Sequence, residues 1–429
     1  MADHLCPSTL AADIDQQKCP LKNYGAGVSF YTPMQSIPAG TATVPQPSGN
    51  SIPKLFQPIK LRGIELQNRI VMSPMCQYSA DNGKHTVWHL THLGGIIQRG
   101  PGLTIIESTT ITEEGRITPE DSGLWEDSQI EPLKRLTDFA HSQGQRVGIQ
   151  LNHAGRKAST VAPWIDRKAA APAGAGGWPD KIFSVSDVPY DEHTHLPQIL
   201  TLDGIAVIKK AFVAAAQRSL AAGFDAIEIH AAHGYLLHAF LSPATNTLLA
   251  PYGGSSENRM RLLLEIVEET RAVIPSAMPL LVRIPGSDWV EGGFTVDDAA
   301  LLGAELAKRG VDFIDVSTGG LMSTQKIISS PGYQAPFSRA VKKAVEGAGA
   351  LVSVVGLITS AAQAEELLQN GSADVVFVGR PFQKNPGLVW QWAEELGLEL
   401  RVANQIGWGY GQHAGRGIKV DLGKDALFN

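Results

Sequence analysis

Eight short apolar segments recur along this chain, and most are followed by an amphipathic stretch. This alternation limits the possible folds more than any other property of the sequence. Short apolar runs are typical of strands buried on both faces of a parallel sheet. The segments span residues 69–72, 103–106, 147–149, 226–229, 280–283, 313–316, 351–355 and 374–378. Eight strand–helix units in succession predict an α/β fold, the (β/α)8 or TIM barrel.

The amphipathic stretches between these segments have the spacing and end signals of helices. Asp203 is an expected N-cap, as is either Thr295 or Asp297. Glycines in left-handed backbone conformation are expected just after four helices. They are Gly144, Gly223, Gly310 and Gly371. The clearest predicted helices span 130–142, 204–222, 258–273, 297–308, 339–346 and 360–369.

The chain is predicted to hold one domain with two extensions. Residues 1–53 are rich in Pro, Ser, Thr, Ala and Gln and are predicted to form an irregular N-terminal arm. Residues 54–395 would form the barrel, and 396–429 a C-terminal tail. The Ala-, Gly- and Pro-rich stretch 169–197 is expected to be a long loop over the barrel mouth. No GxGxxG opens a helix after a strand, so a Rossmann module is not expected.

Composition narrows the function classes. The 429 residues include 36 basic and 42 acidic side chains, for a net charge of -6, which favours neither nucleic acid nor an anionic membrane as partner. No apolar run reaches the roughly 18 residues of a membrane span. The three cysteines form no CxxC pair, which argues against a disulfide framework or an iron–sulfur cluster. We therefore expect a cytoplasmic enzyme.

The most informative local stretch is His230-Ala231-Ala232-His233-Gly234-Tyr235, directly after the fourth apolar segment. The carboxyl end of a barrel strand is where such folds carry out chemistry. His230 and His233 could donate hydrogen bonds to one oxygen, and Tyr235 could supply a proton beside it. Two alternatives stay open. The residues could serve packing alone, or the two histidines could bind zinc, although no third ligand is visible nearby.

Polar and small residues also follow the other seven segments, which packing alone does not explain. They are Ser73, Pro74, Met75 and Cys76, then Ser108, Gln150, Arg283, Ser317 with Gly319 and Gly320, Gly356, and Gly379 with Arg380. Because the strands are parallel, these residues should share one rim of the barrel.

Several of these strand ends suggest an anionic, heterocyclic ligand. Gly356, Gly379 and Arg380 lie where barrels commonly bind phosphate, after strands seven and eight. Arg283 ends an apolar strand and needs an anionic partner, which could be a ligand or an internal carboxylate. Gln150 can both donate and accept, which suits the edge of a heterocycle.

From Leu55 to Glu394 the sequence resembles the Old Yellow Enzyme family, FMN-dependent ene-reductases, in its thermophilic-like and fungal branch. The resemblance depends on several motifs in the family's order. They are Ser73–Tyr78, Glu113–Ile117, Gln150–Lys157, His230–Tyr235 continuing to Leu241-Ser242-Pro243, Asn246 with Tyr252–Ser255, Asn258-Arg259, and Gly379-Arg380.

The resemblance implies roles for the rim residues. Ser73–Cys76, Ser108, Gln150 and Arg283 would contact the flavin ring, and Gly356, Gly379 and Arg380 would hold the FMN phosphate. Arg283 would then stabilise the anionic reduced ring. Cys76, otherwise an inert buried thiol, would lie near the flavin C4 carbonyl. Tyr78 would contact substrate.

The resemblance also implies a reaction, with NADPH as hydride donor. An α,β-unsaturated carbonyl or nitro compound would bind through its oxygen to His230 and His233. Tyr235 would protonate the α carbon. A flavin-dependent isomerase or dehydrogenase of a biosynthetic pathway is the main alternative. A zinc-dependent hydrolase using His230 and His233, and a non-enzymatic binding barrel, are alternatives from other classes.

The C-terminal tail departs from the family pattern. Related enzymes often end in a Gln-Tyr-x-Arg-like segment, whose arginine reaches the active site of a neighbouring subunit. Here the comparable residues are Gln405-Ile406-Gly407-Trp408. The sequence therefore does not predict that interlocked arrangement, and a homodimer is left open.

Overall fold

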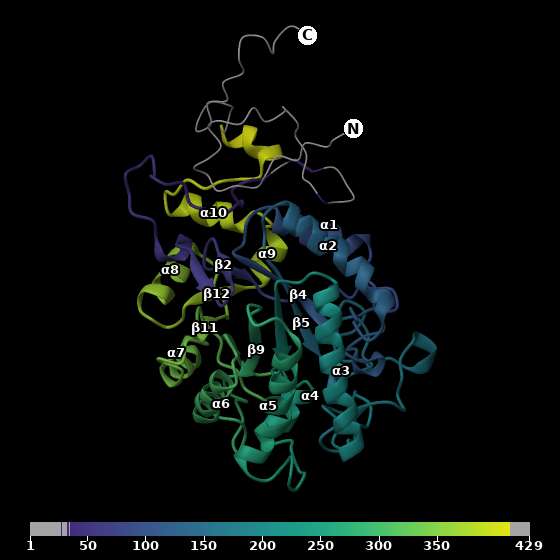
Figure 1. Ribbon diagram of the computed structural model, residues 1–429. Coiled ribbons are helices and arrows are strands. Elements are labelled where there is room, and N and C mark those ends of the chain that lie inside the picture. The colour runs from purple at the N-terminus through teal and green to yellow at the C-terminus, as the bar shows by residue number, and fades with distance from the viewer. Residues whose placement is uncertain (1–26, 28–31, 34, 412–429) are drawn as a thin grey trace, which may run out of the picture.

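A computed structural model describes residues 27, 32–33 and 35–411. Eight parallel strands close into a barrel in chain order, which confirms the predicted fold (Figure 1). All eight apolar segments form its strands. These are β3 (Ile70–Met72), β4 (Leu103–Thr110), β5 (Val147–Asn152), β8 (Ala226–His230), β9 (Leu280–Pro285), β10 (Phe313–Ser317), β11 (Leu351–Val354) and β12 (Val375–Val378). The barrel closes where Phe377 of β12 pairs with Val71 of β3.

Helices surround the barrel (Figure 1). They are α1 (Val87–Ile97), α2 (Ile130–Ser142), α3 (Leu202–Ala221), α4 (Leu236–Leu241), α5 (Ser256–Val273), α6 (Val296–Lys308), α7 (Ala335–Ala344), α8 (Ala361–Gln369), α9 (Arg380–Lys384) and α10 (Leu388–Glu395). Short 3-10 helices are η1 (Lys54–Phe56), η2 (Glu113–Gly115), η3 (Asp127–Gln129), η4 (Gly155–Lys157), η5 (Ala173–Ala175) and η6 (Asn404–Tyr410).

The predicted helix caps and helix ends are confirmed in part. Thr295 caps α6 through its hydroxyl, as one of the two alternatives predicted. The prediction of Asp203 as a cap is wrong, because the Thr201 hydroxyl accepts the Gly204 N–H and α3 begins two residues earlier. Helix α7 begins at Ala335 rather than 339. The four predicted glycines all have positive φ, between 68° and 85°.

A hairpin closes the amino-terminal end of the barrel. Strands β1 (Ile59–Leu61) and β2 (Ile64–Leu66) pair antiparallel. Leu61 and Leu66 are buried in one cluster with residues near the start of the barrel strands, including Leu103 and Phe313. This apolar plug leaves the carboxyl end of the strands as the open end.

The stretch predicted as a loop over the mouth is mostly irregular. It contains β6 (Phe183–Ser184), which pairs in parallel with β7 (Gln198–Ile199) just beyond it. Ile182 is buried in a cluster against which Trp178, Cys76 and Tyr235 pack. The loop therefore covers part of the rim that carries the predicted site.

The described part of the N-terminal arm lies along the C-terminal tail. Ala42 forms an isolated bridge with Leu400, and Gln46 Nε2 donates to the Glu399 carbonyl at 3.0 Å. The remaining residues of the predicted arm and tail, 1–26, 28–31, 34 and 412–429, lie outside the described residues.

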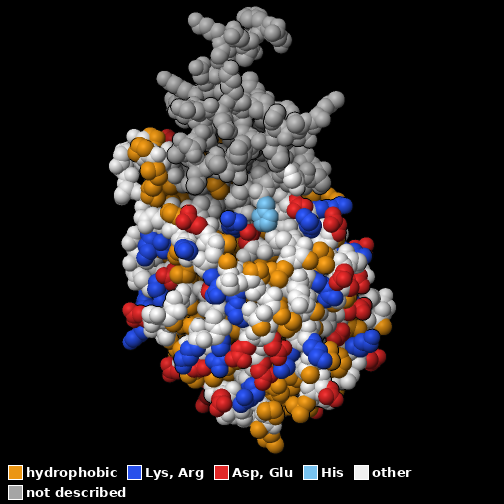
Figure 2. Space-filling model, viewed as in Figure 1, with side chains coloured by type: hydrophobic (Ala, Val, Ile, Leu, Met, Phe, Trp, Pro, Cys, Tyr) orange, Lys and Arg blue, Asp and Glu red, His pale blue; other side chains and the backbone are white. Residues whose placement is uncertain are grey.

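Two surface properties bear on possible partners. Within the described residues, none of the helices has the length and apolarity needed to cross a bilayer. Acidic and basic side chains are intermixed over the face drawn in Figure 2.

Candidate active site at the carboxyl end of the barrel

The strand register brings the predicted residues to the carboxyl end of the barrel, at two neighbouring levels. Ser108 pairs with Gln150 across β4 and β5, helped by an irregularity in β4 between Ile106 and Ser108. On the next strands, His230 pairs with Arg283. Since Gln150 pairs with Glu228, the His230–Arg283 pair lies two residues further along the strands than the Ser108–Gln150 pair.

The two histidines of the motif face each other. His230 ends β8 and is buried, whereas His233 lies in the following turn with φ of +61°. His230 Nε2 and His233 Nδ1 are 3.2 Å apart, and the rings are almost perpendicular, at 90°. An oxygen placed beside both nitrogens would lie within hydrogen-bond distance of each.

Both imidazoles are held neutral. Burial lowers the pKa of each histidine well below its ordinary value, and the nearby Arg283 and Lys157 charges lower both further. The Ala232 N–H donates to His230 Nδ1 at 3.2 Å, so neutral His230 carries its proton on Nε2. Zinc would need that Nε2 lone pair, so this arrangement does not suit the zinc alternative.

Tyr235 stands beside the pair, at the N-terminal end of α4. Its ring centroid lies 5.1 Å from that of His230, edge to face. Burial raises the pKa of the Tyr235 hydroxyl well above its ordinary value, so it is fully protonated at neutral pH. A protonated phenol next to two imidazoles can act as a general acid.

Arg283 has an internal carboxylate partner, which was the alternative interpretation in the sequence. Its Nε donates to Asp315 Oδ2, and Nη2 donates to Ser73 Oγ at 2.7 Å. The pair is buried. Since a guanidinium has five N–H donors, these two bonds still leave donors for a ligand at the rim.

Gln150 is tied to a buried acid that the sequence analysis did not select. Gln150 Nε2 donates to Glu228 Oε1 at 2.6 Å. Burial raises the pKa of Glu228 to about 8, against the opposing effect of Arg283. Glu228 Oε2 is buried without a hydrogen-bond partner among the described residues.

The segment after β3 carries Ser73, Pro74, Met75 and Cys76. The Ser73 N–H donates to the Val378 carbonyl at 2.9 Å, which anchors the segment to β12. Burial, followed by the Asp121 and Glu107 charges, raises the pKa of the Cys76 thiol well above its ordinary value. Cys76 is therefore a thiol that can donate a weak hydrogen bond, and not a nucleophilic thiolate.

The predicted phosphate residues also lie together. Gly356 has φ of +113°, and a Cβ there would lie 2.8 Å from Gln334 Nε2. A Cβ on Gly379 would lie 3.2 Å from Met75 Sδ. The Arg380 side chain is exposed and makes no hydrogen bond or ion pair within residues 35–411, although its charge acts on the Tyr333 hydroxyl. Two glycines and an unpaired cation at adjacent strand ends suit an anion.

Tyr78 packs against Trp164, an aromatic residue that was not predicted to belong to the site. Tyr78 has left-handed backbone, with φ of +48°. Its ring centroid lies 5.5 Å from that of Trp164, at an angle of 78°. Trp164 is 67% exposed, which is unusual for tryptophan, but exposure is not visible in the sequence. It belongs to an irregular excursion after β5, so no periodic pattern predicted its position.

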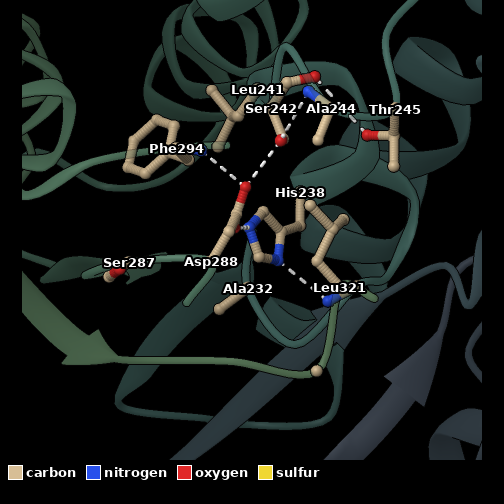
Figure 3. Close-up of polar contacts among 12 residues, drawn as sticks. Ala232, His238, Leu241, Ser242, Ala244, Thr245, Ser287, Asp288, Phe294 and Leu321 are labelled. Carbon is tan, nitrogen blue, oxygen red and sulfur yellow. Dashed lines mark hydrogen bonds and ion pairs between the residues drawn. The ribbon is translucent and has the colours of Figure 1, made fainter. Parts of the chain in front are cut away.

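A hydrogen-bond network that was not predicted from the sequence supports the turn that carries His233. The Gly234 N–H donates to His238 Nδ1 at 2.9 Å, and His238 Nε2 donates to Asp288 Oδ1 at 2.8 Å. The other oxygen of Asp288 accepts from Ser242 Oγ and from the Phe294 N–H, each at 2.6 Å (Figure 3). A histidine inside the apolar helix α4 was the available signal.

Lys157 joins the same turn to the loop after β10. Its Nζ donates to the His233 carbonyl at 2.9 Å and to the Gly320 carbonyl at 2.7 Å. It also lies over the Tyr190 ring, 4.4 Å from the centroid. Burial, together with Arg156, lowers the pKa of Lys157 to about 7.

A buried cluster of His85, His89 and Glu107 has atoms within 4.8 Å of one another, as a metal site would. Its geometry argues against one. His89 Nδ1 accepts the Thr86 N–H at 3.0 Å, so the neutral ring carries its proton on Nε2, facing Glu107. The His85 and His89 rings are stacked at 9° and cannot both direct lone pairs at one ion. We interpret the cluster as packing.

Comparisons with known proteins agree with this geometry. A model of the NADH:flavin oxidoreductase / NADH oxidase family matches residues 54–399. An NADH:flavin oxidoreductase of Gibberella zeae is 51% identical over 90% of this chain and 94% of its own. An NADPH dehydrogenase of Listeria monocytogenes is 42% identical over 82% of this chain and 98% of its own.

Solved structures give the same result. Morphinone reductase has a TM-score of 0.67 at 27% identity, covering 82% of this chain and 91% of its own. An Old Yellow Enzyme homologue from Zymomonas mobilis has a TM-score of 0.66 at 26% identity, covering 82% and 95%. The chain is an NAD(P)H-dependent flavin oxidoreductase, and it belongs to the NADH:flavin oxidoreductase / NADH oxidase family, that of the Old Yellow Enzymes.

Proposed function

We propose that this enzyme binds FMN and uses NADPH to reduce activated C=C bonds, in α,β-unsaturated carbonyl or nitro compounds. The observation that carries the proposal is the 3.2 Å approach of two neutral imidazoles, with a protonated tyrosine beside them. Such a set is suited to an oxygen that becomes negatively charged during reaction. The proposed domain boundaries are residues 54–395 for the barrel, with 1–53 and 396–429 as extensions.

The residues present fit the cofactor. Arg380, which has no ion-pair partner in the described part of the chain, and the glycines at 356 and 379 would hold the phosphate. Gln150 and Arg283 would contact the polar edge of the ring, with Ser73 to Cys76 and Ser108 beside it. When bound, the flavin would supply hydride transfer from NADPH to the substrate.

The chain's own residues would polarise the substrate. His230 and His233 would donate to the carbonyl or nitro oxygen and stabilise its developing negative charge. Losing one such donor typically lowers the rate by about 10²–10³. Tyr78 would contact the substrate from the segment after β3, and Trp164 packs against its ring.

Tyr235 would hold the proton that is delivered to the α carbon. Its hydroxyl is protonated at neutral pH, because burial raises its pKa. General-acid catalysis of this kind is typically worth about 10²–10⁴ in rate.

A half-reaction experiment tests the proposal. Tyr235→Phe removes the acidic proton but keeps the ring, so 2-cyclohexen-1-one reduction should slow by about 10²–10⁴. Bleaching of the flavin absorbance by NADPH under anaerobic conditions should continue at nearly the wild-type rate. If both half-reactions fall equally, Tyr235 is not the proton donor.

Wild-type protein provides the test of reaction class. Net NADPH consumption with an enone supports a reductase. Conversion of the enone without NADPH consumption would instead support an isomerase. A purified protein that carries no flavin and binds none on addition would overturn the proposal.

A further inference from the structure

The histidine pair belongs to a longer hydrogen-bond chain. The Ala232 N–H donates to His230 Nδ1 at 3.2 Å, and His230 Nε2 lies 3.2 Å from His233 Nδ1. The other nitrogen of His233, Nε2, lies 2.7 Å from Ser317 Oγ. Ser317 ends β10 and is itself buried.

The protons along this chain can be counted. A backbone N–H only donates, so His230 Nδ1 must accept and its single proton is on Nε2. That proton is donated to His233 Nδ1. His233 then carries its own proton on Nε2 and donates it to Ser317 Oγ.

This hydrogen-bond arrangement is satisfied when substrate is absent, but it does not let both rings donate to a substrate oxygen. The His230 Nε2–H is already used by His233, and His233 Nδ1 directs a lone pair at the place an oxygen would occupy. A substrate oxygen can accept from both rings only if His233 carries its proton on Nδ1. His233 Nε2 would then be an acceptor and would need a donor.

We propose that Ser317 is a positioning residue whose hydroxyl reverses from acceptor to donor, and so lets His233 change tautomer when a substrate oxygen binds. This inference rests on the proposed function. One proton leaves Nε2 and one arrives at Nδ1 through solvent, which reaches the partly exposed His233. No net proton is taken up, and the Ser317 hydroxyl keeps its proton throughout.

The surrounding structure fixes the distance on which this exchange depends. The Gly286 N–H donates to the Ser317 carbonyl at 2.9 Å, which holds the end of β10. Lys157 bridges the His233 and Gly320 carbonyls, so the histidine turn and the loop after β10 are held together. A hydroxyl is the right group here because it both donates and accepts, unlike an amide N–H or a carboxylate.

The tautomers can be read directly by ¹⁵N NMR of imidazole-labelled, oxidised holoenzyme. In the absence of ligand, His233 should show a protonated Nε2 and an unprotonated Nδ1. With saturating 4-nitrophenolate these assignments should exchange, while His230 keeps its proton on Nε2. If His233 has the same tautomer in both states, the inference is overturned.

Variants of Ser317 supply a second test. In Ser317→Ala, His233 Nε2 has no donor in the bound state, so 4-nitrophenolate should bind roughly 5- to 100-fold more weakly. Ser317→Thr keeps the hydroxyl and should restore most of the affinity and the tautomer exchange. Flavin content, measured by absorbance, should be equal in all three proteins. Wild-type affinity in Ser317→Ala would overturn the inference.

The outcomes separate the two proposals. Binding of 4-nitrophenolate and turnover of an enone without tautomer exchange would leave the proposed function standing and remove the role of Ser317. If wild-type holoenzyme neither binds the phenolate nor reduces enones, the proposed function fails first.

Discussion

Replacing Asp288 tests whether the network behind the histidine turn is a structural determinant of the site. Both Asp288 and its partner His238 are fully buried. Burial alone would raise the pKa of Asp288, but hydrogen bonds from His238 and Ser242 lower it below its ordinary value. The carboxylate is therefore ionised and accepts three hydrogen bonds, from His238 Nε2, Ser242 Oγ and the Phe294 N–H.

Asp288→Asn keeps the shape but changes one acceptor into a donor. If the new amide NH2 faces His238, two donors meet. His238 Nδ1 accepts the Gly234 N–H, so the ring must keep its proton on Nε2. If the amide faces the other way, it meets the Phe294 N–H. One buried donor is orphaned in either case, at a cost of about 1–3 kcal/mol. Asp288→Ala removes the acceptor of all three hydrogen bonds and should therefore cost more than Asp288→Asn.

Denaturant unfolding of the flavin-free proteins would measure these changes, because bound flavin adds a stabilisation that depends on the affinity of each variant. Asp203→Asn is a matched exposed control, expected within about 0.5 kcal/mol of wild type. Asp288→Asn should also weaken phenolate binding, because the Gly234 N–H is part of the His233 turn. An Asp288→Asn protein as stable as the control would refute the reasoning.

Three further predictions follow from single residues. Arg380→Ala should weaken FMN binding roughly 10- to 150-fold without changing the stability of the flavin-free protein; unchanged affinity in a fluorescence titration would contradict the phosphate assignment. Trp164→Ala removes the ring packed on Tyr78, so kcat/KM for a bulky enone should rise relative to 2-cyclohexen-1-one, and an unchanged ratio would argue against contact with substrate. Glu228 has a folded pKa of about 8, above its unfolded value, so it favours folding at low pH and disfavours it as pH rises. Relative to Glu228→Gln, wild type should therefore lose stability between about pH 4.5 and 8, by at most about 1.4 kcal/mol per pH unit.

The barrel was predictable from the sequence because each strand is short, mainly apolar and largely buried. Helix α1 was not among the predicted helices, since Gly94 and Gly95 lower its helix propensity. The N-terminus of α3 was misplaced by two residues, because Thr201 and Asp203 are both good caps and only the backbone geometry decides between them.

The site was predictable to the extent that it follows from strand ends. Parallel strands bring Ser108, Gln150 and Arg283 to one rim whatever their separation in sequence. Partners supplied by loops were not predictable in this way. Asp288 lies 50 residues from His238, and its role depends on how the loop after β9 returns to α4.

The position of the β1–β2 hairpin affects how substitutions can alter such an enzyme during evolution. The hairpin seals the end of the cylinder opposite the chemistry, and Leu61 and Leu66 contribute only apolar contacts there. Contacts that stabilise this end of the barrel are therefore separate from the residues proposed to select the substrate. Substitutions in the β1–β2 hairpin are therefore expected to change thermal stability without changing the substrate range.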